Sequence, residues 1–299
     1  MKIYEDILKS RQRIVRSINA HGFSPDHNYY NYLYTQNADK KCIFLDFGKA
    51  RGILAFFSKE KRIWRVINGV FAPQNERFGI FMEFLDWVFK ENKSAKVFAE
   101  FAEDFKSELF KKLKASFKMN VSYSLYWPIY NLDNLDEKLS GKGWKKLRNI
   151  RNRFVNNYKI EIKNPKKVDK EALRKVLLSW TKKRYPRDRA NFNYYSNIIQ
   201  NNFEGLDALR TISLDGEVCS FSGGWMVPNS SDFYYAIGIF NYRHKYLGDF
   251  INLDDLLYLK NLGFKQIELG GSDQATILFK KKFNPIKIYK TSFFSICPK

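Results

Sequence analysis

The sequence QIELGGSDQATILFKKKFNP, residues 266–285, combines a short apolar run, two adjacent glycines, a helical segment and a proline. The apolar run predicts a strand, and Gly270 with Gly271 permits a positive φ or a close approach of the backbone. Asp273 stands where a helix over 273–283 would begin, so it can cap that helix or contact a substrate. This segment is therefore predicted to run from a strand through a tight connection into a short helix.

The segment belongs to a pattern of strands and helices that occurs twice. Runs rich in β-branched and aromatic residues alternate with amphipathic segments over residues 41–130 and again over 208–296. The predicted order in both halves is β-β-β-α-β-α-β, and Gly263 is expected to end the long helix of the second half. Pro128 predicts that the strand over 121–130 is an edge or terminal strand. The pattern indicates an α+β protein of two similar domains, each with helices covering a mainly antiparallel sheet.

The chain is strongly basic. Its 299 residues include 52 lysines and arginines against 31 aspartates and glutamates, a formal net charge of +21. A hydrophobic fraction of 44% excludes intrinsic disorder, and no run of about 18 apolar residues predicts a membrane span. The charge favours a polyanionic partner such as nucleic acid or an anionic membrane surface, whereas biased codon usage is the alternative explanation.

Cysteine and histidine are rare and scattered. The three residues of each type form no cluster, which argues against a disulfide framework and against a structural metal site. The first 20 residues are charged throughout and lack the apolar centre of a signal peptide. We therefore expect a cytoplasmic protein that holds no metal and no resident cofactor.

A basic segment separates the two predicted domains. No acidic residue occurs from Lys138 to Ile160. One predicted helical face carries Lys145, Arg148, Asn149, Asn152 and Asn156, and the other carries Trp144, Leu147, Ile150, Phe154 and Tyr158. The cations can bind phosphate or carboxylate groups, and a solvated surface helix is the alternative. The predicted parts are an N-terminal domain over 1–136, a linker helix bridging the domains over 137–160, and a C-terminal domain over 161–299.

A second basic segment, KKRYPRDR, occupies residues 182–189. It combines cations with an aromatic residue and a proline, which suits contact with a phosphate or the face of a base. Arg184 and Arg187 are the candidate phosphate ligands, and a helix end rich in cations is the alternative.

A third basic segment, FNYRHKYLGD, connects a predicted strand to a helix over residues 240–249. Such a connection presents backbone N–H groups to an anion, here with Arg243, Lys245 and Gly248 nearby. An ordinary connection capped by Asp249 is the alternative.

Two segments resemble motifs of a known family. The order strand, Gly-Gly, short helix, Phe-Lys-x-x-Phe, Asn-Pro and strand from residue 266 onward resembles the final motif of FemAB-type tandem-GNAT aminoacyltransferases. It is also similar to the DUF2156 domain of phosphatidylglycerol lysyltransferases. Residues 139–154 are similar to the linker L-x-G-K-x-x-x-K-x-R-N-x-x-N-x-F of that family. The resemblance implies two tandem GNAT-like domains with mixed, mainly antiparallel sheets flanked by helices, but residues 243–248 depart from the GNAT pyrophosphate loop because they contain a single glycine.

The resemblance implies transfer of an aminoacyl group from aminoacyl-tRNA to an amine or hydroxyl of a small molecule, a peptide or a lipid headgroup. This reaction needs a positioned acceptor, a route for its proton and a donor to the oxyanion, but no covalent nucleophile. The predicted catalytic residues are Asp273, Gln274, Tyr235 and Lys281. The predicted ligands of the donor and its phosphates are Lys145, Arg148, Asn149, Arg184, Arg187, Arg243, Lys245, Gly248 and Lys280. Residues expected to shape the substrate site are Gly270, Gly271 and Trp225.

Two other functions fit the same residues. One is N-acyl transfer from acyl-CoA or an acyl-carrier protein, and the other is a non-catalytic tandem GNAT module that binds RNA or anionic lipid. Any membrane contact is expected to be peripheral. The structural alternatives are a helix cap for Asp273 and core packing for Trp225.

Overall fold

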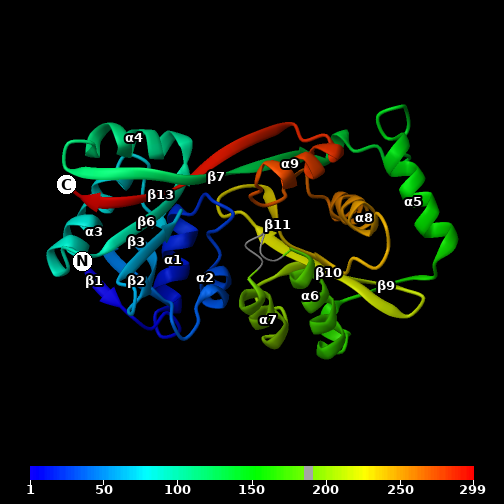
Figure 1. The fold of residues 1–299 in the computed structure, drawn as a ribbon, viewed down its shortest axis with the longest axis horizontal. Helices are drawn as coiled ribbons and strands as arrows, with labels where there is room; N and C mark the ends of the chain where they lie inside the picture. The colour runs from blue at the N-terminus through cyan, green and yellow to red at the C-terminus, as the bar shows by residue number, and fades with distance from the viewer. Residues whose placement is uncertain (185–190) are drawn as a thin grey trace.

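The computed structural model describes residues 1–184 and 191–299. Within them, one sheet of 13 strands runs through the molecule, and helices cover both of its faces (Figure 1). The first half contains β1 (Lys2–Tyr4), α1 (Arg11–His21), α2 (Tyr29–Thr35), β2 (Lys41–Gly48), β3 (Arg51–Ser58), β4 (Ile63–Ile67), β5 (Val70–Phe71), α3 (Arg77–Glu91), β6 (Lys96–Ala102), α4 (Glu103–Leu113) and β7 (Phe117–Asn131). The second half contains η1 (Leu132–Asn134), α5 (Lys145–Asn157), β8 (Ile160–Lys163), η2 (Pro165–Lys167), α6 (Lys170–Arg184), α7 (Phe192–Gln200), β9 (Asp207–Leu214), β10 (Glu217–Met226), β11 (Asp232–Phe240), α8 (Leu247–Asn261), β12 (Gln266–Glu268), α9 (Gln274–Lys280), η3 (Lys281–Phe283) and β13 (Lys287–Pro298).

The alternation of side chains along the strands builds a core on each face of the sheet. In β2, Ile43 and Leu45 pack with α3 and α4, whereas Cys42 and Phe44 pack with α1 and α2. In the second half, α6 and α7 cover one face and α8 with α5 covers the other. Gly263 follows α8 with a φ of +88°, which confirms the predicted end of that helix.

The two halves share their strands at the junction. The strand order is β6-β13-β7-β12-β11, so the last strand of the chain pairs with β6 and β7 of the first half. β7 in turn pairs with β12 of the second half. The repeated α+β architecture is confirmed, but both halves belong to one continuous sheet.

The prediction that Pro128 marks an edge strand was wrong, because β7 lies between β13 and β12. Pro128 accepts a hydrogen bond from the Leu269 N–H at 3.3 Å but has no N–H to return. The Leu269 carbonyl instead accepts a hydrogen bond from Nζ of Lys280. The Lys280 side chain thus supplies the hydrogen bond that a backbone N–H at position 128 would otherwise donate. The Leu269 carbonyl is therefore satisfied although Pro128 lies in an interior strand.

The N-terminal segment ties the two halves together. The indole N–H of Trp225 donates to the Pro25 carbonyl at 2.8 Å, and the Tyr34 hydroxyl donates to the Glu204 carbonyl at 2.8 Å. Trp225 is only 3% exposed. It is therefore a core residue that anchors the N-terminal segment, and its role in shaping the substrate site stays a prediction.

The basic helix forms as predicted but lies elsewhere. α5 buries Leu147, Ile150 and Phe154, and the Phe154 ring stacks on Phe250 of α8 at 4.7 Å. Figure 1 shows α5 at the outer end of the second half, far from the first half. The helix links the halves in sequence without bridging them in space, because its apolar stripe packs against Leu247, Phe250 and Ile251 of α8.

Candidate functional site

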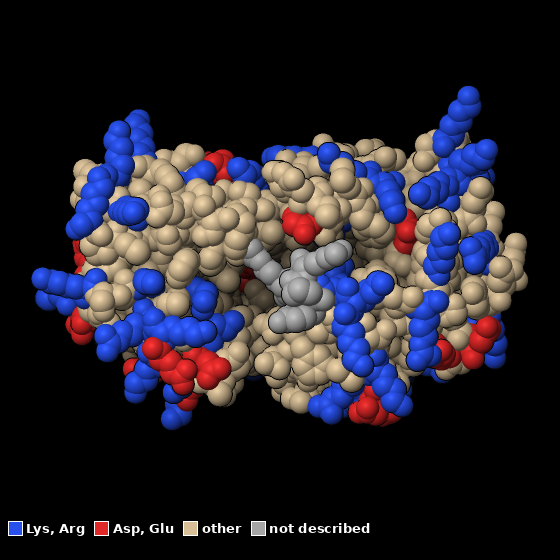
Figure 2. Space-filling model, in the orientation of Figure 1, with Lys and Arg blue, Asp and Glu red and all other residues tan. Residues whose placement is uncertain are grey.

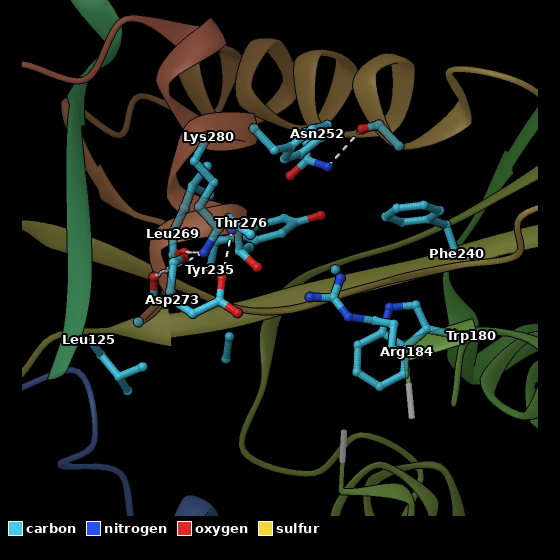
Figure 3. Close-up of a pocket in the computed structure, with 18 of the residues that line it drawn as sticks. Leu125, Trp180, Arg184, Tyr235, Phe240, Asn252, Leu269, Asp273, Thr276 and Lys280 are labelled. Atoms are coloured by element: carbon cyan, nitrogen blue, oxygen red, sulfur yellow. Dashed lines mark hydrogen bonds between the residues drawn. The ribbon is translucent and has the colours of Figure 1, made fainter. Parts of the chain in front are cut away.

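A V-shaped opening between β11 and β12 forms the candidate site. These strands pair in parallel from Asp232 with Gln266 to Tyr234 with Glu268, after which they separate. The opening leads into a cavity of about 800 Å³ (Figure 3). Splayed strand ends of this kind leave backbone groups and side chains free to meet a ligand.

A β-bulge in β11 lies at the apex of the opening. Gly223 of β10 pairs with Ile237 and Trp225 pairs with Tyr234, so β11 has one extra residue at Tyr235–Ala236. The bulge reverses the faces that the following side chains occupy. Ala236 in the bulge and Gly238 beyond it are small residues that line the cavity. The sequence contains no signal for this bulge, because it depends on the register with β10.

Both glycines of the quoted segment are required by the geometry. Gly270 has a φ of +58°, and a Cβ on Gly271 would lie 2.8 Å from the Trp127 ring. These are the two conditions that the Gly-Gly pair predicts. The pair lets the chain leave β12, pass along the cavity and enter α9.

Asp273 caps α9 and lines the cavity. Its Oδ1 accepts a hydrogen bond from the Thr276 N–H at 2.7 Å. This bond, with the charge of Arg184 contributing, holds the pKa of the Asp273 carboxyl below its ordinary value. Figure 3 shows Asp273 and Arg184 extending into the cavity from opposite walls. The carboxylate is therefore ionised at neutral pH and suited to bind a cationic or hydroxyl group.

The other predicted residues of this segment, Lys280, Gln274 and Lys281, lie in three different surroundings. Nζ of Lys280 donates to the carbonyls of Leu269 and Gly270, which places its ammonium on the cavity wall. Gln274 lines a smaller pocket on the other side of Asp273. Lys281 is exposed and does not line the cavity, so the structure gives it no contact with a substrate there.

Tyr235 lines the cavity, but its hydroxyl is bound within the protein. That hydroxyl donates to Oδ2 of Asp255 at 2.5 Å, and Asp255 pairs with Arg210 at 2.9 Å. Arg210 also pairs with Asp254 at 2.6 Å. The polar end of Tyr235 therefore belongs to this buried ionic network, and its contact with the donor carbonyl or phosphate stays a prediction.

The wall opposite Asp273 comes from α6. Trp180 and Arg184 line it, and the guanidinium carbon of Arg184 lies 5.2 Å from the centre of the indole ring. The Trp180 N–H is buried and has no hydrogen-bond partner among the residues that the structure describes. Sequence reasoning found Arg184 but missed Trp180. Arg187 lies outside the described residues.

The predicted residues of α5 divide between two roles. Lys145 and Asn149 line a shallow basic pocket, together with Lys146 and Arg153. Arg148 instead turns inward and donates to the carbonyls of Leu139 and Gly141. Its guanidinium therefore braces the loop before the helix, and its binding of the donor stays a prediction.

The connection between β11 and α8 links this basic pocket to the cavity. Tyr246 lines both, and Gly248 lines the cavity. A Cβ on Gly248 would lie 2.4 Å from the Phe240 ring, so only glycine fits there. Arg243 pairs with Glu217 outside the cavity, and Lys245 lies over the Tyr246 ring at 5.2 Å. Of these two predicted cations, only Lys245 contacts a residue that lines either pocket.

Basic side chains cover much of the visible surface, including the outer end of the second half where α5 lies (Figure 2). They also cover the first half, so the charge is not confined to the three segments that the sequence singled out. The α5 pocket shares one lining residue, Tyr246, with the cavity.

Two carboxyl groups, the half-buried Asp26 and the buried Glu268, predict an unusual pH dependence of stability. Burial raises the pKa of Asp26 to about 7, with the charge of Glu100 contributing, and burial raises the pKa of Glu268 to about 8. Below these values the folded protein binds protons that the unfolded chain releases near pH 4. The free energy of unfolding is therefore expected to fall as pH rises from about 4 to about 8.

Denaturant titrations across this pH range check the expectation. Asp26→Asn is expected to flatten the decline below pH 7, whereas Asp86→Asn, at an exposed position of α3, leaves it unchanged. An equal slope in wild type and Asp26→Asn would contradict it.

The described residues contain no cluster of three His, Cys, Asp or Glu side chains that could hold a metal ion. Nor is any described helix both long and apolar enough to cross a bilayer.

The comparisons with known proteins rest on structure. No protein-family model and no curated protein sequence matches the chain. A conserved protein of unknown function from Bacteroides thetaiotaomicron is 15% identical over 100% of both chains, with a TM-score of 0.71. The C-terminal DUF2156 domain of a putative lysylphosphatidylglycerol synthetase from Agrobacterium fabrum is 15% identical over 97% of this chain and 92% of that one, with a TM-score of 0.66. FemX is 12% identical over 99% of this chain and 97% of its own, with a TM-score of 0.65. The chain therefore has the tandem-GNAT fold that FemX and the DUF2156 domain share.

Proposed function

We propose that the protein is an acyltransferase that moves an aminoacyl group from aminoacyl-tRNA to an amine or hydroxyl acceptor. The observation that carries the proposal is that Tyr246 lines both the basic α5 pocket and the cavity. A polyanionic donor bound along α5 can place its acylated end in the cavity, where Asp273 and Lys280 lie. The fold shared with FemX and a putative lysylphosphatidylglycerol synthetase supports this reading.

The chemistry needs no covalent intermediate on the protein. The acceptor nitrogen or oxygen attacks the ester carbonyl carbon, the carbonyl becomes a tetrahedral oxyanion, and the bond to the ribose oxygen then breaks. The proton lost by the acceptor ends on the departing ribose oxygen. Asp273 accepts a hydrogen bond from the N–H or O–H of the neutral acceptor and orients it for attack, since its lowered pKa makes it a weak base. The ammonium of Lys280 adds positive charge beside the reacting carbonyl.

Acyl-CoA is the second candidate donor. The start of α8 at Leu247 and Gly248 lines the cavity, and the N-terminus of a helix favours phosphate. The acceptor is an amine or hydroxyl of a small molecule, a peptide or a lipid headgroup in either case.

A donor competition tests the proposal. The protein is incubated with a pool of aminoacylated tRNAs, or with a pool of acyl-CoAs, and with candidate amine and lipid acceptors. Loss of the ester from tRNA with formation of acylated acceptor supports the proposal. Consumption of acyl-CoA alone supports the second candidate, and consumption of neither donor contradicts both.

Charge removal on α5 is expected to weaken tRNA binding specifically. The triple variant Lys145→Ala, Lys146→Ala and Arg153→Ala removes three cations of the basic pocket. The slope of log affinity against log salt concentration is expected to fall by about 2 to 3, because each lost phosphate contact retains its counterion. Filter binding or fluorescence anisotropy at several salt concentrations measures the slope.

A matched triple variant in the first half supplies the control. Lys59→Ala, Lys61→Ala and Lys93→Ala removes the same charge at exposed positions remote from α5. An equal loss of affinity in the two triple variants would show that total charge, and not the α5 pocket, attracts tRNA.

A further inference from the structure

Tyr234 occupies the apex of the opening between β11 and β12. It is the last residue of β11 that pairs with β12, opposite Glu268. Its side chain is half-buried and lines the cavity. Tyr235 follows in the bulge and turns its hydroxyl to Asp255, so the two adjacent tyrosines send their polar ends to opposite sides of the sheet.

Rigid neighbours hold the Tyr234 ring. The ring centre lies 5.2 Å from that of Trp225 and 6.2 Å from that of Trp127. A Cβ built on Gly270 would lie 3.4 Å from the Tyr234 hydroxyl oxygen and 4.0 Å from Nζ of Lys280. The phenol and the ammonium therefore flank one point of the cavity wall, and the absence of a side chain at Gly270 keeps that point open.

The Tyr234 hydroxyl is a hydrogen-bond donor with no assigned acceptor. It makes no hydrogen bond to any residue within 1–184 or 191–299. Burial, with the charge of Asp26 contributing, raises the pKa of Tyr234 well above its ordinary value, so the phenol keeps its proton at every working pH. A donor that stays protonated beside an ammonium suits a ligand oxygen that becomes negative.

We propose that Tyr234 is a catalytic residue whose hydroxyl donates a hydrogen bond to the acyl carbonyl oxygen as it becomes the tetrahedral oxyanion. This inference rests on the proposed acyl transfer. When the acceptor attacks the carbonyl carbon, the electron pair of the C=O bond moves to the oxygen facing Tyr234. The pair returns when the bond to the leaving oxygen breaks, so Tyr234 keeps its own proton throughout.

The paired variants Tyr234→Phe and Tyr235→Phe test the inference. Tyr234→Phe is expected to lower kcat about 10²-fold while the KM for the donor and the thermal midpoint stay at their wild-type values. The midpoint is unaffected because the free protein makes no hydrogen bond with this hydroxyl. Tyr235→Phe is expected to lower the midpoint, because it removes the bond to Asp255, and to reduce kcat at least tenfold less than Tyr234→Phe does.

Binding measurements distinguish a failure of the role of Tyr234 from a failure of the proposed acyl transfer. Affinity is measured for two adenosine derivatives, a stable 3′-amide analogue of the donor and a 3′-phosphonate that mimics the oxyanion. Tyr234→Phe is expected to weaken phosphonate binding at least tenfold and to leave amide binding unchanged. Equal affinities of both proteins for the phosphonate, or an unchanged kcat, would overturn the role of Tyr234 while leaving acyl transfer intact. Failure of the wild type to bind either analogue or to consume a donor would overturn the proposed function itself.

Discussion

Replacement of Asp273 by asparagine is expected to lower kcat/KM for the acceptor about 10²-fold, with the KM for the donor unchanged. The carboxylate lines the cavity and is ionised at neutral pH, so its charge is what binds and orients the acceptor. Asparagine keeps a side-chain oxygen for the Thr276 N–H and is as good a cap as aspartate. Initial rates over a range of acceptor concentrations measure the effect, and the thermal midpoint is expected to stay unchanged.

Two further variants separate the charge from the cap. Asp273→Ala is expected to show the same loss of activity and to be destabilised by about 1 kcal/mol, because the Thr276 N–H loses its acceptor. Asp86→Asn removes an equal charge at an exposed site and is expected to be fully active. Wild-type activity of Asp273→Asn would show that Asp273 is only a helix cap.

Replacement of Arg210 by methionine is expected to lower the free energy of unfolding by about 3–5 kcal/mol. The Arg210 side chain is 6% exposed and lies between Asp254 and Asp255, and the Asp255 side chain is 3% exposed. Without the guanidinium, the Asp255 carboxylate remains buried without its counter-ion. The hydrogen bond by which Asp255 holds the Tyr235 hydroxyl is weakened as a result. Denaturant titration monitored by tryptophan fluorescence measures the loss.

An exposed ion pair provides the control for Arg210. Arg243 pairs with Glu217, and their side chains are 65% and 45% exposed, so Arg243→Met is expected to change stability by less than about 1 kcal/mol. Adding Asp255→Asn to Arg210→Met is expected to restore part of the lost stability, because the uncompensated charge is removed. Similar losses for Arg210→Met and Arg243→Met would contradict the role assigned to the buried network.

The candidate site was predictable wherever a residue's role follows from its immediate neighbours. Gly270, Gly271 and Asp273 are such residues, since a turn and a helix cap are set within a few positions along the chain. Tyr235 was chosen over Tyr234 because nothing local reveals a bulge in β11. One extra residue in a strand moves the following side chains to the other face, and only the register with β10 shows where it occurs.

The amino-acid sequence by itself determined the order β-β-β-α-β-α-β in each half, the glycine pair after β12 and the apolar stripe of α5. Backbone requirements and side-chain periodicity act over a few residues, so these features are local. Only the tertiary structure decided that β13 enters between β6 and β7, that Lys280 takes the place of the N–H missing at Pro128, and that Arg148 serves a loop while Lys145 faces a pocket. These outcomes depend on partners far away in sequence. A hydrogen bond or an ion pair across such a separation leaves no periodic trace in the chain, and it forms only when the strands of both halves come together in one sheet.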